Sequence, residues 1–321
     1  LALGCLASAI GFMLYASINS YPNFLLCEFL IAAGAALLSG ADKALLYDTI
    51  LELKKKKEAR HYISRYDAAG TLGIVVSMPL GSFIAGTALM PYPAVLTLPM
   101  FMTAAAGLIG IFFALGLHEP KRKKPLENPV KLGIDGFKYI LKTKLLREIS
   151  FNYLLISATT FFMFWLYQTL LRGTTISIAY FGLVGAGINI FAMLLLINLK
   201  KLENIFGMKR LIFLSALLPA LFYLAVAFFR NIYMIFAAIF IVTGLRLLRA
   251  PVLTDFMNRY IKSKNRATVL SGVSMLDRFV IAVFYPFVGL LLDKSLTFVL
   301  VLLGVATLIF ALTTRIGEKH F

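Results

Sequence analysis

The chain has few of the residues that build disulfides and metal sites. Its 321 residues include two cysteines and three histidines. Cys5 and Cys27 lie in apolar segments, where cysteine is usually a small buried hydrophobe, so we expect no disulfide. His61, His118 and His320 are too scattered along the chain to suggest a common metal ion. We therefore expect neither a metal nor another cofactor.

Motifs of membrane enzymes and of nucleotide-driven pumps are also missing. The sequence has no histidine-rich cluster, paired-aspartate motif, Gly-x-Ser-x-Gly elbow or nucleotide-binding motif. A membrane enzyme needs a nucleophile with its base, a metal cluster or an acidic diphosphate-binding set. We expect that the protein is not an enzyme. A polytopic membrane enzyme acting on a lipid or lipid-linked substrate remains the alternative from another class.

Acidic residues are scarce: 15 Asp and Glu stand against 32 Lys and Arg, which gives a formal net charge of +17. A strongly basic chain can indicate nucleic-acid binding. Here, however, the charge is divided among several short loops instead of one surface. We therefore expect contact with anionic membrane lipids and no nucleic-acid partner.

Long apolar runs dominate what is present, because 60% of the residues are hydrophobic, against about 45–50% in soluble domains. A helix that crosses a bilayer needs about 20 mostly apolar residues. The predicted spans are 1–18, 24–47, 68–89, 95–116, 148–171, 176–198, 210–229, 231–253, 267–292 and 296–314. The sequence thus predicts an all-α polytopic membrane protein with about ten transmembrane helices.

The loops between these spans alternate between basic and neutral. The basic stretches hold 25 of the 32 Lys and Arg residues and are 51–66, 117–147, 199–210, 254–266 and 315–321. The intervening loops 19–23 and 90–94 carry no charge. Because cytoplasmic loops retain Lys and Arg, we expect both ends of this chain on the cytoplasmic side of the plasma membrane.

One long connection divides the spans into four and six. Within residues 117–147, Asn128 and Pro129 predict a helix start, and apolar residues then recur at spacings of three and four. This pattern predicts an amphipathic helix on the inner membrane surface. The predicted parts are an N-terminal bundle (1–116), this basic linker and a C-terminal six-helix bundle (148–321).

The two bundles share a spacing. Residues 44–48 (ALLYD) precede a basic stretch and then residues 78–81 (MPLG), while residues 251–255 (PVLTD) precede a basic stretch and then residues 285–289 (YPFVG). In both cases proline follows the aspartate by 31 residues. With a central cytoplasmic loop, this favours the two pseudo-symmetric parallel repeats of a transporter fold.

Several segments resemble a prokaryotic branch of the major facilitator superfamily. Residues 39–48 (SGADKALLYD) resemble the end of its fourth helix, and 249–251 (RAP), 258–261 (NRYI) and 265–271 (NRATVLS) resemble its tenth-to-eleventh helix junction. Residues 201–210 resemble a degenerate signature loop, which implies a gate or structural role for Glu203, Gly207, Lys209 and Arg210. The whole chain corresponds to helices three to twelve of twelve, so we expect an N-terminally incomplete sequence.

The resemblance implies a secondary active transporter that moves a small solute by alternating access. Residues 1–116 would rock against residues 148–321, with coupling to an ion that is most often a proton in this family. The solute stays open between an organic anion and a drug-like hydrophobic compound, and we expect a monomer. A non-transporting scaffold built on the same fold is a further alternative.

Charged residues inside predicted spans are costly and therefore mark function or pairing. Asp277 and Arg278 lie roughly 15 Å into a span about 30 Å thick. They indicate either a substrate or proton-coupling site or an ion pair that locks the helix to a neighbour. Arg246 and Arg249 share one helix face in the cytoplasmic third of their span. They could bind an anion, close the inner gate or reach the lipid head groups.

Acidic residues near the inner helix ends form a second set. Asp42 is expected a turn and a half above Asp48, more deeply buried, and is therefore the better candidate proton carrier. Asp48 and Asp255 occupy equivalent repeat positions. They are predicted to be structural acceptors for helix N-termini or for Arg60 and Arg266.

Trp165 and Gln168 fall in the outer third of the span 148–171. An aromatic residue at that depth is usually a membrane-interface anchor. The family resemblance places this helix on the central cavity, which implies a contact between these side chains and the solute. Both interpretations stay open.

Overall fold

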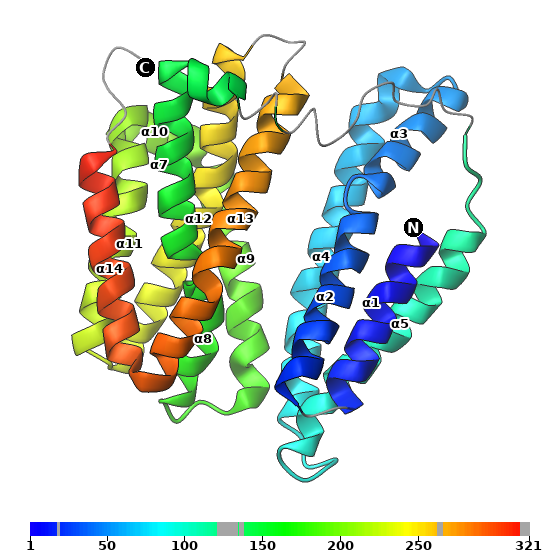
Figure 1. The fold of residues 1–321 in the computed structure, drawn as a ribbon, viewed down its shortest axis with the longest axis horizontal. Coiled ribbons are helices and arrows are strands. Elements are labelled where there is room, and N and C mark those ends of the chain that lie inside the picture. Colours follow the sequence, from blue (N-terminus) through cyan, green and yellow to red (C-terminus); the bar gives the residue numbers. More distant parts are fainter. Residues whose placement is uncertain (18–19, 121–133, 135–137, 262–265, 315–321) are drawn as a thin grey trace. The chain divides into compact units, whose positions relative to one another are not determined.

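The computed structural model describes residues 1–17, 20–120, 134, 138–261 and 266–314. These residues form helices and turns and no strand, in two compact units (Figure 1). The first unit contains Leu1–Pro125 and Ile176–Ala186, and the second contains Leu126–Thr175 and Gly187–Phe321. Residues 176–186, which the sequence assigned to the C-terminal bundle, thus pack with the first unit.

The first unit consists of apolar helices joined by short turns. They are α1 (Ala2–Ser17), α2 (Tyr21–Leu38), α3 (Ala41–Glu52), α4 (Ala59–Ala85) and α5 (Leu98–Leu115), with 3-10 turns η1 (Lys56–Glu58) and η2 (Ala94–Thr97). Helix α1 packs against α2 and α5. The α1–α2 contact needs a glycine, because a Cβ at Gly34 would lie 2.8 Å from the backbone nitrogen of Ser8. Small residues allow such close backbone approach between membrane helices.

A segment distant in sequence completes the first unit. The turn η3 (Ile178–Tyr180) and the start of α9 (Phe181–Ile197) lie against α4. The Ser82 hydroxyl donates a hydrogen bond to the Ala179 carbonyl at 2.9 Å. A Cβ at Gly182 would lie only 1.9 Å from the Met78 carbonyl oxygen, so a side chain there would separate the two backbones.

The second unit is built around α7. Its helices are α7 (Lys144–Phe161), α8 (Met163–Arg172), the rest of α9, α10 (Leu199–Phe206), α11 (Met208–Phe228), α12 (Ile232–Tyr260), α13 (Arg266–Lys294) and α14 (Leu296–Thr313). Helix α7 packs against α12, α13 and α14, and Ile149 and Ile156 on it are fully buried. Side chains from α12 and α13 can therefore meet on α7.

The described helices suit a bilayer. Nine are long and apolar enough to cross a membrane, and Ala2–Ser17 is a shorter apolar helix. Large apolar side chains such as Phe112 and Tyr233 are exposed, which is favourable in lipid and unfavourable in water. The prediction of an all-α polytopic membrane protein is confirmed.

Two predicted spans differ from the helices observed. The span predicted over 24–47 lies within the membrane-length segment Tyr21–Glu52 but is interrupted, because Gly40 adopts a φ of +84° and separates α2 from α3. Glycine enters this left-handed region without the steric cost that a Cβ imposes. Helix α12 continues to Tyr260, beyond the predicted end at 253. The predicted amphipathic helix that begins at Asn128 falls mostly outside the described residues.

Candidate functional site

A stripe of polar and aromatic side chains runs along α7. Tyr153, Ser157 and Phe161 are four residues apart and therefore share one face of the helix. The Ser157 hydroxyl interacts with Tyr153 and with Asp277 of α13. The three α7 residues were not singled out from the sequence, although their spacing within an apolar span was a signal that could have found them.

Asp277 faces this stripe from near the middle of α13. It is 11 residues from the start of the helix, roughly 16 Å at 1.5 Å per residue. The side chain is half-buried, and its Oδ1 atom is shielded and has no hydrogen-bond partner among the described residues. Arg278 is exposed, but its charge still acts on Asp277.

Arg246 approaches the same stripe from α12. Its guanidinium lies 5.0 Å from the centroid of the Phe161 ring, a cation–π contact. Its Nε atom is buried without a hydrogen-bond partner among the described residues, and its charge interacts with that of Asp277. Arg246 lies 14 residues from either end of α12. It is thus at the middle of α12, because the helix continues beyond the predicted end of the span; its depth in the bilayer stays a prediction.

Arg249, one turn further along α12, has a different environment. It is 3% exposed, and Nη1 donates hydrogen bonds to the Ile212 carbonyl (2.6 Å) and the Ser215 hydroxyl (2.7 Å). Nη2 donates to the Asn152 side-chain oxygen, and the Asn152 amide donates to the Thr314 carbonyl at 2.6 Å. This network joins α12 to α7, α11 and the end of α14, and all of its acceptors are neutral.

Aromatic side chains continue the stripe beyond Phe161. Trp165, one turn further along the chain, forms a T-shaped pair with Tyr285, with 6.1 Å between ring centroids. Tyr285 follows Asp277 by two turns and therefore shares its face of α13. Phe162 lies 6.0 Å from the same ring. The facing sides of α7–α8 and α13 are therefore polar near Asp277 and aromatic near Tyr285.

The other α8 candidate, Gln168, is exposed. Its amide nitrogen lies 3.5 Å from the hydroxyl of Tyr167, a neighbour on the same helix. Trp165 is half-exposed and belongs to the aromatic stripe. The structure thus brings one of these two candidates to the Asp277 side of α13 through its contact with Tyr285.

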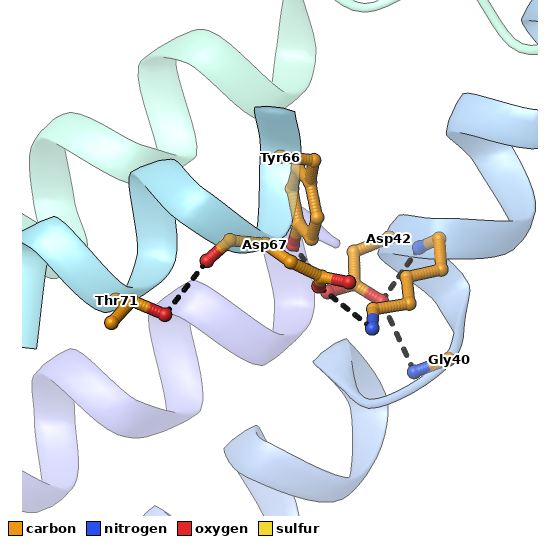
Figure 2. A network of polar contacts seen from close by, with 6 residues as sticks. Gly40, Asp42, Tyr66, Asp67 and Thr71 are labelled. Carbon is orange, nitrogen blue, oxygen red and sulfur yellow. Dashed lines mark hydrogen bonds and ion pairs between the residues drawn. The ribbon is translucent and has the colours of Figure 1, made fainter. Parts of the chain in front are cut away.

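The first unit has its own polar network at the start of α3 (Figure 2). Asp42 Oδ1 accepts hydrogen bonds from the backbone N–H groups of Gly40 (3.1 Å) and Lys43 (2.7 Å), and Oδ2 accepts one from the Tyr66 hydroxyl of α4. Lys43 Nζ lies 2.8 Å from Asp67 Oδ1. The network fastens the first turn of α3 to α4.

The surroundings of Asp42 differ from those expected. The break at Gly40 places Asp42 in the first turn of α3, where a carboxylate interacts favourably with the helix dipole. The side chain is only partly buried, as is that of Asp48. The expectation that Asp42 is more deeply buried than Asp48 is therefore not evident in the structure, and its role as a proton carrier stays a prediction.

The remaining gate candidates lie near helix ends. Asp255 accepts a hydrogen bond from Arg259 at 2.9 Å, and both side chains are exposed. Arg60 and Arg266 lie at the starts of α4 and α13, but their side chains fall outside the described part of the chain. The predicted pairs of these arginines with aspartates therefore stay predictions.

The segment expected to resemble a signature loop forms α10 and the turn into α11. Gly207 adopts a φ of +74° between the two helices, and its N–H donates to the Glu203 carbonyl at 2.8 Å. Lys209 and Arg210 are exposed in the first turn of α11. Glycine is needed at 207 because other residues rarely adopt this backbone conformation.

Sequence comparison identifies the family. The profile described as "Major Facilitator Superfamily" matches residues 1–276, which is most of the chain. The protein belongs to the major facilitator superfamily. This confirms the resemblance noted from residues 39–48 and 249–271. None of the curated proteins has a sequence that matches this chain.

Solved structures with this fold include several transporters. A point mutant of the nucleoside transporter NupG has a TM-score of 0.76 at 13% identity, with 98% of this chain and 81% of that chain covered. A POT family transporter in complex with a thioalcohol-conjugated peptide has a TM-score of 0.70 at 13% identity, covering 97% and 79%. A bacterial homolog of the human lysosomal transporter Spinster, inward-facing and unoccupied, has a TM-score of 0.68 at 15% identity, covering 98% and 80%.

Identities this low establish the fold and not the solute. Together with family membership, these neighbours point to transport of a small-molecule solute by an integral membrane protein and away from enzymatic activity.

Proposed function

We propose that the protein is a secondary active transporter that moves a small organic solute by alternating access, driven by a proton gradient. The observation that carries this proposal is the pair of charged residues near the middles of α12 and α13. Arg246 and Asp277 both approach the polar stripe of α7, and each keeps a buried polar atom without a partner among the described residues. Charge held at such depth is costly and usually serves transport.

In this proposal the two charged residues have separate roles. Arg246 binds a hydrogen-bond acceptor of the solute through its unpaired Nε. Asp277 takes up and releases the coupled proton, since a carboxylate whose surroundings change between two states changes its affinity for protons. Arg249 holds α12 in place for both, through its hydrogen bonds to neutral groups of α7 and α11.

The conformational change proposed is a rocking of residues 1–116 against residues 148–321, with this chain's ends on the cytoplasmic side of the plasma membrane. Basic inner loops would approach acidic helix ends when the inner side is closed. The Asp42 network would keep α3 and α4 together during this movement, because its hydrogen bonds and ion pair link the two helices.

Reconstitution in liposomes tests the proposal. Purified protein is inserted into vesicles that contain a pH-sensitive dye, and a panel of small organic anions, cations and neutral solutes is added outside. A transporter coupled to protons gives solute-dependent pH changes that are absent from protein-free vesicles. Conversion of an added lipid-linked substrate would favour an enzyme, and the absence of both signals would favour a scaffold.

A further inference from the structure

The charges of the side chains near Tyr153 in the second unit do not sum to zero. The charges of Arg246, Arg249 and Asp277 all act on this residue. Two of these three groups are cationic and one is anionic, which leaves a net charge of +1 among them, and the exposed Arg278, whose charge also acts on Asp277, adds to the excess. No other described carboxylate pairs with either arginine. The described part of the unit therefore holds an excess positive charge in its interior.

Only one of the two arginines is available to a ligand. Both arginines keep a buried Nε without a partner among the described residues, but Nη1 and Nη2 of Arg249 are engaged by protein acceptors and the residue is only 3% exposed. Arg246 is less completely buried, its Nε atom has no hydrogen-bond partner among the described residues, and its guanidinium lies over the face of the Phe161 ring. Of the two arginines on α12, Arg246 is therefore the one placed to bind an anion.

An aromatic surface adjoins this arginine. The Phe161 ring contacts the guanidinium of Arg246. Trp165 follows Phe161 by four residues and pairs with Tyr285. Rings of this kind favour offset or edge-to-face contact with a flat apolar body. Trp165 is half-exposed, so part of its surface is free to make such a contact.

We propose that this site takes an organic monoanion with an aromatic body. Its acidic group binds Arg246, and its ring lies against Phe161 and Trp165. While Asp277 is ionised, one negative charge brings the net charge of the three residues to zero, whereas a neutral ligand leaves +1 and a cation raises it to +2; when Asp277 is protonated, the anion is needed even more. Uncompensated buried charge is strongly unfavourable, so the anion is selected. This inference rests on the proposed function, because it names the solute class for the same site.

Trp165 provides the signal for the test, since it is the only tryptophan of the chain. Fluorescence titrations of the purified protein use phenylacetate, phenylacetamide and phenethylamine, which differ mainly in charge. We expect the carboxylate to bind at least about tenfold more tightly than the amide, as charge-assisted hydrogen bonds predict, and the amine to bind most weakly. Cyclohexylacetate, which lacks the aromatic ring, should bind more weakly than phenylacetate.

Matched variants test whether the fluorescence change reports binding at Arg246. Arg246→Gln should weaken phenylacetate binding by about tenfold or more, whereas Arg172→Gln, at an exposed position on α8, should leave it unchanged. Trp165→Phe should remove the fluorescence change. If Arg246→Gln does not fold, Arg246→Lys keeps the charge without the guanidinium fork and should weaken binding less than a neutral substitution would.

Binding of the amide or the amine as tightly as phenylacetate would overturn the proposed solute class, and so would the absence of phenylacetate binding. The liposome panel separates this failure from that of the wider proposal. Vesicles that respond to neutral or cationic solutes would contradict the anionic class and leave transport standing. Vesicles that respond to no solute would count against transport itself.

Discussion

The two units differ in how completely their charged side chains are paired. At the start of α3 in the first unit, Lys43 pairs with Asp67 and Asp42 accepts three hydrogen bonds. The side chains of Lys43 and Asp67 are about half-exposed, at 52% and 51%. Charges in such a setting are fully paired, and each pair contributes little to stability, about 0–1 kcal/mol.

In the second unit the charged groups are deeper and less well paired. The described acceptors of Arg249 are neutral, and Arg246, Arg249 and Asp277 each retain a buried atom without a partner among the described residues. Residue type alone therefore does not locate a site, because both units carry acidic and basic residues on their helices. The difference lies in which polar atoms the fold leaves without partners.

The largest effect on stability should come from the hydrogen bonds of Arg249. Asn152→Leu removes the acceptor of Nη2 and leaves a buried cation with fewer partners, so we expect a loss of about 3 kcal/mol in the free energy of unfolding. Equilibrium unfolding in mixed detergent micelles measures this loss in the free energy of unfolding. Asn204→Leu, at an exposed position within α10, is the matched control and should change stability by less than about 0.5 kcal/mol. Equal effects of the two variants would show that the Arg249 network does not hold the second unit together.

The break between α2 and α3 should depend on Gly40. Gly40→Ala places a Cβ at a φ of +84° and should cost about 1–2 kcal/mol, measured by the same unfolding assay. Gly70→Ala is the control, because a Cβ at that helical position meets nothing within 4 Å and alanine favours helix. A Gly40→Ala protein as stable as Gly70→Ala would mean that α2 and α3 can join into one helix.

The smallest effect should come from the first unit's exposed network. Tyr66→Phe removes one donor to the Asp42 carboxylate and should cost about 0.5–1 kcal/mol. Tyr62→Phe removes a weaker contact, 3.4 Å from Lys55 Nζ, and should have no measurable effect. If Tyr66→Phe lowered the free energy of unfolding as much as Asn152→Leu, the polar networks of the two units would not differ in their contribution to stability.

Much of the fold could be predicted from the sequence, because apolar length and loop charge are local signals. The span predicted over 210–229 corresponds to α11 at Met208–Phe228, and that over 296–314 to α14 at Leu296–Thr313. The break at Gly40 could not be predicted, since glycine permits a left-handed backbone without requiring it. Nothing in the apolar run 24–47 distinguishes the two outcomes.

The candidate site could be predicted only by its charged members. Arg246 and Asp277 were selected because charge inside a span is rare. Ser157 and Phe161 are ordinary membrane-helix residues, and their importance depends on the packing of α12 and α13 against α7, which no local pattern gives. The extension of α12 to Tyr260, past Pro251, was likewise not predicted, since the residues after 253 include charged and polar ones that end the apolar run.

The proton-coupling role of Asp277 is tested most directly by Asp277→Asn in the dye-loaded vesicles, with Asp293→Asn at the exposed end of α13 as the control. The amide keeps the shape of the side chain but cannot carry a proton. We predict that Asp277→Asn loses the solute-dependent pH change while it still exchanges labelled solute across the membrane, and that Asp293→Asn retains both. A pH change as large in Asp277→Asn as in the unmodified protein would contradict the account.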